Sequence, residues 1–255
     1  MRWPAIVCFL VTLGICHSPL ADTLQFRTLE NPPLEYMKSG RVVGMVAELV
    51  REAVKRTGHT AEIKVRPWKR VLYEIDKGQA DAAFNVGRND KREQYALFSE
   101  EVLVDERYVL FSHRQRDLPA DLSGVEDFML GEQLGYFYGD RFMEVLNDSR
   151  YKEVRTDTIT KNLKMLIAER TDFFVGDWLP TLYYIREMGA SNEVFPVHRQ
   201  GTDEPLTVSV SPTYAAFSRK TVSPEYVETF DAALREMKED GTYDAIRERY
   251  ELPYP

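Results

Sequence analysis

The sequence predicts an α/β protein built from two similar lobes, and three observations favour this fold class. Apolar runs of four to eight residues, bounded by turn residues, are typical of strands buried on both faces, and the run at 80–86 is the clearest. Between such runs, apolar residues recur at helical spacing. A unit of helix, tight turn and strand also occurs twice with the same offsets, at Leu72, Ile75 and Asp81 and at Leu163, Leu166 and Asp172.

Residues 1–21 differ from the rest of the chain. Arg2 precedes a mostly apolar run that is too short for a confident membrane span, and small and turn residues follow it up to Ala21. This pattern predicts a secretory signal peptide over 1–21. Cleavage is expected after Ala21 or, as an alternative, after Ser18.

Both cysteines, Cys8 and Cys16, lie inside the predicted signal peptide. Ile15 is bulky for the position before a lipidated cysteine, which argues against a lipid anchor on Cys16. The exported chain would therefore contain no thiol and no disulfide, and its stability would depend on a hydrophobic core.

The composition is that of an acidic globular protein. The chain has 255 residues, 44% of them hydrophobic, which is enough for one large or two modest domains. Its net charge is −8, and removal of Arg2 with the leader would make the charge one unit more negative. This charge argues against nucleic acid and anionic membranes as partners. No later run approaches 18 apolar residues, so no anchor is expected in the exported part.

Turn and cap residues divide the first half of the chain into alternating strands and helices. The prolines at 32 and 33 cannot extend a ladder, and Gly58 and Gly78 each close a helix. Pro67 suits the first position of a helix. The expected elements are strands at 23–29 and 61–65, a hairpin tip at 38–40, helices at 46–57 and 67–77, and the buried strand at 80–86.

The second half is expected to follow the same alternation. Gly135 to Gly139 would leave backbone amides exposed at a helix N-terminus, where a carboxylate is favoured. The expected elements are a strand at 107–112, a strand and glycine turn from 128 to 139, the second repeated unit, a helix at 180–188, a β-rich segment at 205–218, a helix that begins after Ser223, and a short last helix after 240–242.

The two repeated strands end near residues of opposite charge. In open α/β sheets, ligands bind beyond the carboxyl ends of strands, and here that place receives Asn85, Gly87, Arg88 and Arg92. The planar fork of arginine matches a carboxylate with two parallel hydrogen bonds. The second strand leads to Asp177, so a zwitterion would fit between the two ends. The alternatives are that the arginines are solvated surface residues and that Asp177 only caps the next helix.

Several short motifs occur in a characteristic order: Pro32-Pro33 with Tyr36, Gly44 with Glu48, Pro67-Trp68, Gly78 with Asp81, Arg92 with Phe98-Ser99, Asp172 with Gly176-Asp177, and Asp240-Gly241-Thr242-Tyr243 with Tyr250. Together they resemble the periplasmic solute-binding proteins of amino-acid ABC transporters, the bacterial extracellular solute-binding proteins of family 3. The resemblance covers about residues 23–253.

The resemblance implies a type II periplasmic-binding-protein fold, in which two α/β lobes close on a ligand in the cleft between them. By position, lobe 1 would comprise 22–103 and 211–255, and lobe 2 would comprise 104–210. Two β crossovers would join them near 102–107 and 208–212. The implied role is the periplasmic component of an ABC importer, a monomer that binds a small solute and delivers it to a membrane permease. No cofactor, metal or catalytic residue is implied.

The family's pattern also implies eight ligand-binding positions in this sequence. Arg92 takes the place of the arginine that pairs with the ligand's α-carboxylate, and Asp177 that of the acid that holds the α-ammonium. Trp68, for which core packing is the alternative, takes the place of an apolar wall. The other five positions, where this chain departs from the residues usual in the family or compensates for a departure, are Tyr36, Asn85, Gly87, Tyr136 and Phe137. The aromatic residues expected around the cleft favour a bulky or cationic amino-acid-like ligand; they are Tyr36, Trp68, Tyr136, Phe137 and Trp178.

An enzyme on the same scaffold, similar to a dehydratase or a lytic transglycosylase, is the alternative function. It would need an acid or base of tuned pKa in the cleft, and Glu35, Glu100 and Glu101 are the candidates. The sequence has no G-x-S-x-G motif, and the histidines at 59, 113 and 198 are too scattered to suggest a metal site. A sensor input domain, the third class, would need a membrane span and an output module, and neither is recognisable in the sequence.

The first testable prediction concerns the exported form. We expect a soluble chain that begins between Pro19 and Asp22 and carries no thiol, because the leader contains both cysteines. Intact-mass spectrometry of the secreted protein measures this directly. A mass that includes residues 1–18, or a lipid adduct on Cys16, would contradict the prediction.

Overall fold

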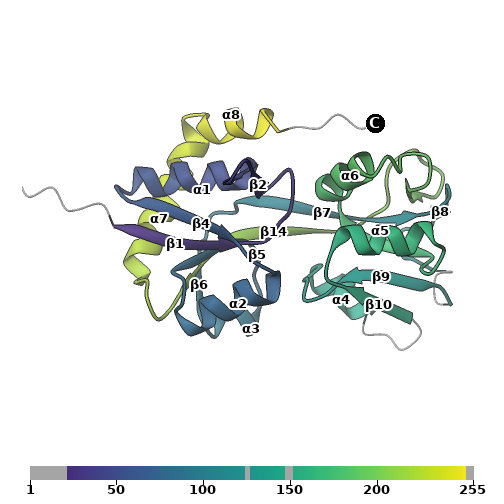
Figure 1. Cartoon of the computed structure of the whole chain (residues 1–255), viewed down its shortest axis with the longest axis horizontal. Helices are drawn as coiled ribbons and strands as arrows, with labels where there is room; N and C mark the ends of the chain where they lie inside the picture. The colour runs from purple at the N-terminus through teal and green to yellow at the C-terminus, as the bar shows by residue number, and fades with distance from the viewer. Residues whose placement is uncertain (1–21, 124–126, 147–151, 251–255) are drawn as a thin grey trace, which may run out of the picture.

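The computed structural model describes residues 22–123, 127–146 and 152–250. These residues form two groups of helices along one twisted sheet (Figure 1). The predicted signal peptide, with both cysteines and both cleavage sites, lies outside the described residues. Within the described part, no helix is both long enough and apolar enough to cross a bilayer.

Ten strands of the described residues form one mixed sheet that runs through both lobes, which confirms the α/β fold class. The order is β10-β9-β11-β7-β14-β5-β1-β4, and the short β6 and β12 pair with β14 and β7. The bounds are β1 Thr23–Thr28, β4 Thr60–Val65, β5 Ala82–Gly87, β6 Ala96–Phe98, β7 Val104–Ser112, β9 Met129–Gln133, β10 Lys152–Thr156, β11 Phe173–Asp177, β12 Phe195–Pro196 and β14 Thr207–Ser218.

Lobe 1 contains the parallel strands β1, β4 and β5. Its other elements are the hairpin strands β2 Tyr36–Lys38 and β3 Arg41–Val43, with helices α1 Met45–Arg56, α2 Trp68–Lys77, α3 Asp90–Glu93, α7 Pro224–Glu239 and α8 Thr242–Glu248. The ring of Phe26 lies at the centre of an aromatic core, with centroids 6.3 Å from Phe84 and 6.1 Å from Phe217. Strands covered on both faces need apolar residues on both faces, which is why the run at 80–86 was visible in the sequence.

Lobe 2 contains the parallel strands β9, β10 and β11. Its other elements are α4 Asp140–Leu146, α5 Ile159–Ile167 and α6 Trp178–Glu187, with the short strands β8 Asp117–Leu118 and β13 His198–Arg199. Side chains of β7 alternate between two cores: Val109 and Phe111 pack with α5 and α6, whereas Tyr108 and Leu110 pack on the opposite face.

The repeated unit has the same geometry in both lobes. In lobe 1, Asp81 N–H donates to Gln25 O at 2.9 Å, and Gln25 N–H donates to Asp81 Oδ2 at 2.8 Å. In lobe 2, Asp172 N–H donates to Met129 O at 2.8 Å, and Met129 N–H donates to Asp172 Oδ2 at 2.8 Å. Each aspartate therefore anchors the start of its strand to the neighbouring parallel strand.

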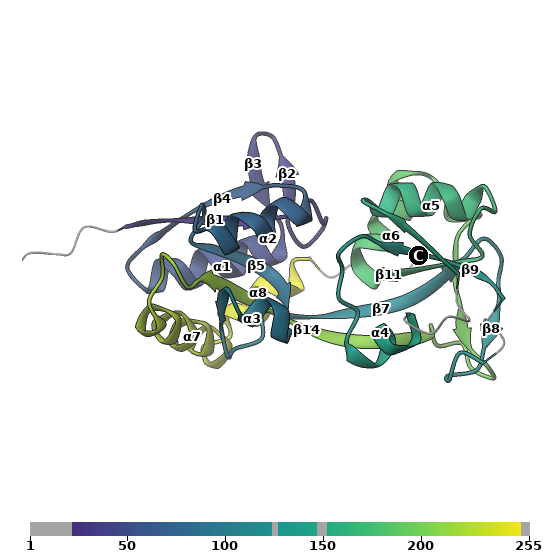
Figure 2. The same ribbon diagram turned by 90° about the horizontal axis from the view of Figure 1, so that it is seen from below.

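The two longest strands join the lobes. β7 and β14 pair in antiparallel fashion from Val104 opposite Thr213 to Val109 opposite Thr207, and they run side by side between the two groups of helices (Figure 2). β7 begins earlier than expected because the crossover itself is paired as a strand. The predicted lobe boundaries at 103/104 and 210/211 fall within or next to these strands and remain a proposal.

Several short elements were not expected from the sequence, namely α3, β6, β8, β10, β12 and β13. α3 and β10 carry polar, weakly patterned sequences, whereas β6 is an apolar segment of three residues. β10 is held in place by parallel pairing with β9 from Lys152 opposite Met129 to Thr156 opposite Gln133. Tertiary pairing decides such segments, because local propensity is weak in short strands. Pro67 is the residue before α2, not its first residue as expected.

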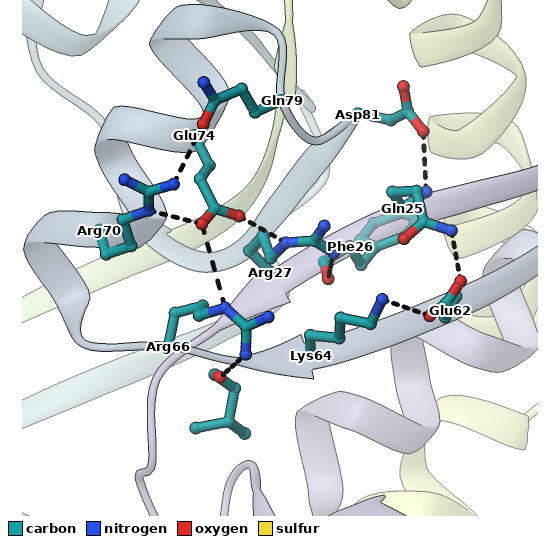
Figure 3. A network of polar contacts seen from close by, with 11 residues as sticks. Gln25, Phe26, Arg27, Glu62, Lys64, Arg66, Arg70, Glu74, Gln79 and Asp81 are labelled. Atoms are coloured by element: carbon teal, nitrogen blue, oxygen red, sulfur yellow. Dashed lines mark hydrogen bonds and ion pairs between the residues drawn. The ribbon is translucent and has the colours of Figure 1, made fainter.

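A buried carboxylate fixes α2 against β1 (Figure 3). Glu74 of α2 accepts a hydrogen bond from Arg27 Nε at 2.7 Å and another from Arg70 Nε at 2.7 Å. Both Glu74 and Arg27 are buried. Burial alone would raise the pKa of Glu74, but hydrogen bonds from Arg70 and Arg27 outweigh burial and the pKa is lowered. This ion pair holds the helix whose first residue is Trp68.

We expect Glu74→Gln to lower the free energy of unfolding by about 3 kcal/mol, because it leaves Arg27 buried without its counter-charge. Glu62→Gln is the control, since Glu62 pairs with Lys64 at an exposed position and its loss should change the free energy of unfolding far less than that of Glu74. Urea denaturation at pH 7 measures both variants. Equal losses in the two would contradict the assigned role of Glu74.

Candidate ligand-binding site

A narrow cavity lies between the lobes beyond the carboxyl end of β5. Its lining comes from both lobes and consists of Leu29, Trp68, Asn85, Gly87, Arg92, Glu106, Tyr108, Tyr136 and Phe137. The space inside is about 20 Å³, enough for about one water molecule. A wider hollow of about 600 Å³ shares Leu29 and Trp68 with it and lies between the start of α2 and the start of α5.

Arg92 lines this cavity and is buried although it is charged. It belongs to α3, where Asn89 caps the helix by accepting a hydrogen bond from Arg92 N–H at 3.0 Å. The guanidinium donates to Gly87 O at 2.5 Å and to Gly135 O at 3.3 Å. No carboxylate of the described residues forms an ion pair with it, and burial lowers its pKa. A desolvated guanidinium of this kind is suited to an anionic ligand group.

The lobes meet around Gly135, whose carbonyl in lobe 2 accepts hydrogen bonds from two side chains of lobe 1. Besides Arg92, Trp68 Nε1–H donates to it at 3.1 Å, and the Arg92 guanidinium lies 5.5 Å from the centre of the Trp68 ring. At Gly87, an added Cβ would lie 3.2 Å from Phe137 Cδ1. A side chain at Gly87 would therefore push against the opposite lobe.

Asn85 lies in β5 with a left-handed backbone, φ 58°, which asparagine tolerates better than most residues. Its amide is buried between two side chains. Thr213 Oγ1 donates to Asn85 Oδ1 at 2.7 Å, and Asn85 Nδ2 donates to Glu35 Oε1 at 2.9 Å. Because backbone strain of this type is often retained at functional sites, Asn85 is a candidate for orienting the surrounding polar groups.

Three acidic side chains, Glu35, Glu106 and Asp177, are buried here and repel one another electrostatically, and the Asn85 amide donates hydrogen bonds to the first two. Burial raises the pKa of Glu35 and Asp177 well above the ordinary range, and the charge of Glu106 raises both further. Burial also raises the pKa of Glu106, to about 7, although Tyr108 and Asn85 donate hydrogen bonds to it. Glu35 Oε2 has no hydrogen-bond partner among the described residues. The cluster therefore holds protons near neutral pH.

Asp177 stands at the N-cap position of α6, but its side chain makes no capping hydrogen bond to that helix. Instead, its Oδ1 accepts a hydrogen bond from Arg107 N–H at 3.3 Å. It also lines a second hollow, of about 480 Å³, together with Arg107, Trp178 and Tyr243. The Trp178 N–H, at the first residue of α6, also donates a hydrogen bond to this carboxyl group, so Asp177 contacts the start of the helix without the usual capping bond.

The structure brings most of the predicted ligand-binding residues together. Those in the cavity lining are Trp68, Asn85, Gly87, Arg92, Tyr136 and Phe137. Asp177 lies beside the second hollow, and Tyr36 lies outside both linings, with its ring 6.2 Å from that of Tyr183 on α6. Their roles in binding remain predictions.

Glu106 and Tyr108 are cavity residues that the sequence reasoning missed. Alternation along β7 could have found them, because Val104, Glu106, Tyr108 and Leu110 share one face and three of them are typical buried residues. Glu106 is thus an acidic residue on the buried face of β7. That pattern is a signal of function or of a specific partner.

The three acids considered for the enzyme alternative, Glu35, Glu100 and Glu101, lie in different parts of the structure. Glu35 belongs to the buried cluster, whereas Glu101 pairs with Arg235 and Lys238 of α7. Glu100 pairs with Arg88 at an exposed position, and neither it nor Glu101 lines the cavity. In the part of the chain that the structure describes, no group of three or more His, Cys, Asp or Glu side chains is arranged to hold a metal ion.

Comparisons with known proteins agree with this architecture. Residues 25–253 match the bacterial extracellular solute-binding proteins, family 3. The L-cystine-binding protein TcyA of Bacillus subtilis (strain 168) is 23% identical over 211 residues, which are 82% of this chain and 73% of that protein.

Solved structures share the fold. An ancestral arginine-binding protein bound to arginine has a TM-score of 0.74 at 23% identity, over 89% of this chain and 97% of that one. A histidine kinase sensor domain with similarity to periplasmic binding proteins has a TM-score of 0.76 at 21% identity, over 91% and 96%. Proteins with different roles therefore share this backbone.

The buried acids predict an unusual pH dependence for the ligand-free protein. Between about pH 4.5 and pH 7, folded Glu106 holds a proton that the unfolded chain releases. Stability from this group is therefore greatest in acid and falls as the pH rises through this window, by on the order of 3 kcal/mol at about 1.4 kcal/mol per pKa unit.

Glu106→Gln should remove the part of this dependence that Glu106 contributes, because the amide does not titrate, while the contributions of Glu35 and Asp177 remain. The measurement is the melting temperature of both ligand-free proteins from pH 5 to pH 8. Carboxylates that are stabilised by ion pairs, such as Glu74, act in the opposite direction but are common to both proteins. A difference between the two curves that does not change with pH would contradict the prediction.

Proposed function

Because the chain belongs to family 3 of the bacterial extracellular solute-binding proteins, we propose that it is the periplasmic solute-binding component of an ABC importer. Its ligand in this proposal is an amino acid or a similar zwitterion, held between the two lobes. The predicted signal peptide supports export to the periplasm. A membrane permease is the proposed partner, and the protein is proposed to act as a monomer without a cofactor.

The observation that supports the proposal most strongly is that Arg92 is buried without an acidic partner among the described residues. Its guanidinium is buried, and its hydrogen bonds to Gly87 O and Gly135 O are to neutral carbonyls of the two lobes. A buried charge without a counter-ion is costly, and the carboxylate of a ligand would supply that counter-ion. Since Arg92 contacts both lobes, a ligand bound to it would also favour the closed arrangement of the lobes.

The opposite charge is supplied by the buried acids. Asp177 is proposed to hold the ammonium group of the ligand, as its position in the family pattern implies. Trp68, Tyr136 and Phe137 line the cavity and offer aromatic faces to a flat or cationic side chain, at about 0.5 to 2 kcal/mol for each good contact. This lining supports a bulky or cationic amino acid over a small polar one.

An enzyme on this scaffold is the second candidate, and Glu106 is the observation that favours it. A carboxyl with a pKa of about 7 in a cavity is suited to general acid or base catalysis near neutral pH. Incubation of the protein with the amino acids that bind it, followed by mass spectrometry of the solution, separates the two candidates. Chemical change of a bound amino acid would favour the enzyme.

The main test removes the proposed carboxylate partner. A thermal-shift panel of the common amino acids and cystine, with mass spectrometry of the natively purified protein, first identifies ligands that bind. Arg92→Ala is then expected to weaken binding by about 2 to 5 kcal/mol, or roughly thirty- to several-thousand-fold, because it leaves the ligand's carboxylate unpaired.

Arg88→Ala is the matched control, since Arg88 is an exposed arginine of the same segment that pairs with Glu93 and Glu100. Its affinity should stay within about threefold of wild type. Asp177→Ala should weaken binding by a similar amount to Arg92→Ala while the ligand-free melting temperature changes little. A ligand that lacks the α-ammonium should lose less affinity in Asp177→Ala than in wild type. Purely additive losses, or stabilisation by glycine, serine or aspartate alone, would count against the proposal.

A further inference from the structure

The acid that shares the cavity with Arg92 is Glu106, not Asp177. Both Arg92 and Glu106 line the same small space, together with Tyr108 and Asn85. This space holds about one water molecule, so an amino acid could bind at Arg92 only if the lobes moved apart, and it would then face the carboxyl group of Glu106. Nothing in the pattern of the sequence motifs assigns a role to this residue.

The strand register brings Glu106 and Asp177 to the same place. Asp177 lies directly opposite Tyr108 in the antiparallel pair of β11 and β7, and Glu106 is two residues before Tyr108 on the same face. Diagonal neighbours of this kind are within reach of each other through their side chains. Asp177 is held at the Arg107 N–H, so it lies beside the peptide unit that follows Glu106.

The polar contacts of Glu106 are built from several elements. On β7 itself, the Tyr108 hydroxyl donates to Glu106 Oε2. From β5, the Asn85 amide donates a hydrogen bond to it. On the paired strand β14, its register partner is Ser211, which is buried and does not titrate near neutral pH. These contacts orient the carboxyl group without neutralising its charge.

More acidic than basic side chains surround Glu106. Arg92 of α3 favours its ionised form, while Glu35 of the loop before β2 and Asp177 of β11 disfavour a further negative charge. The other titratable groups that face it are the tyrosines Tyr108, Tyr136 and Tyr138. Three buried acids and one buried cation cannot all be ionised at low cost, so the ligand-free cluster keeps protons near neutral pH.

We propose that Glu106 and Asp177 form a carboxyl pair that together binds the ammonium group of the ligand, and that a proton held by the pair leaves when the ligand binds. This inference rests on the proposed function in amino-acid binding. The ammonium group arrives with one positive charge, and one proton passes from the pair to solvent. In this proposal the ligand-free pair shares one proton, so one of its carboxyl groups is neutral and the other is ionised. Loss of that proton leaves both carboxylates ionised in the complex, and no covalent bond changes.

The raised pKa of Glu106, about 7, supports this assignment and sets the pH range of the effect. Below that pH, the ligand must displace a proton, so its affinity should increase about tenfold for each pH unit until the pair is ionised without ligand. Above it, the affinity should become independent of pH. Glu106 is thus a specificity-determining residue for the cationic end of the solute.

The test is calorimetry of the exported, ligand-free wild-type protein with L-arginine, L-glutamine and L-cystine as probes. Each titration is carried out at several pH values from 5.5 to 8, in two buffers with different heats of ionisation. For every probe that binds, we expect release of about one proton in the acidic part of this range and almost none at pH 8. Binding without proton release at any pH would overturn the inference.

Two variants test whether the released proton comes from the pair that contains Glu106. Glu106→Gln should abolish most of the proton release and flatten the pH profile, and at pH 8 it should weaken binding at least about tenfold. Glu132→Gln is the control, because Glu132 is another buried acid of raised pKa but pairs with Arg155 outside the cavity lining. It should leave proton release unchanged.

The outcomes distinguish this inference from the proposed function. Retention of proton release by Glu106→Gln, or its loss in Glu132→Gln, would overturn the role of Glu106 while amino-acid binding stands. If none of the three probes binds, nor any amino acid of the thermal-shift panel, the proposed function itself is overturned, and this inference falls with it.

Discussion

The pairing of β7 with β14 is the constraint on which the rest of the structure depends. The two strands lie in the middle of the one mixed sheet, between the strands of the two lobes, so one antiparallel ladder sets how the lobes face each other. The same ladder positions the polar groups of the cavity. Glu106 and Arg107 lie on β7, and Thr213 lies on β14 next to Asn85 of lobe 1. Architecture and site are therefore consequences of one set of backbone hydrogen bonds.

Buried charge is used in two different ways in this molecule. The carboxylate of Glu74 receives hydrogen bonds from Arg27 and Arg70, and this pairing lowers its pKa and secures a helix. No cation of the described residues is in hydrogen-bond contact with the side chain of Glu106 or Asp177, and the pKa values of both are raised. The first arrangement favours the folded chain by itself. The second is costly until a cation arrives, which is what a binding site for a charged solute requires.

The sequence predicted more of the fold than of the site. Parallel strands buried on both faces, repeated helix–turn–strand units and capping glycines are local patterns, so β5, α1 and the repeated Asp81 and Asp172 units were visible in advance. Short polar elements such as β10 were not, because pairing with β9 decides their conformation. Within the site, Arg92 was found because it follows a buried strand, whereas Glu106 looked like an ordinary acid in a crossover.

The sequence by itself determined the α/β class, the two-lobed repeat and a cation at the end of β5, because each depends on residue types at short spacing. The tertiary structure decided which acid faces that cation, since the choice between Glu106 and Asp177 depends on the register of β7 against β11. It also raised the pKa values of both acids. Desolvation and mutual repulsion set those pKa values, and both arise only when residues that are distant in sequence are brought together.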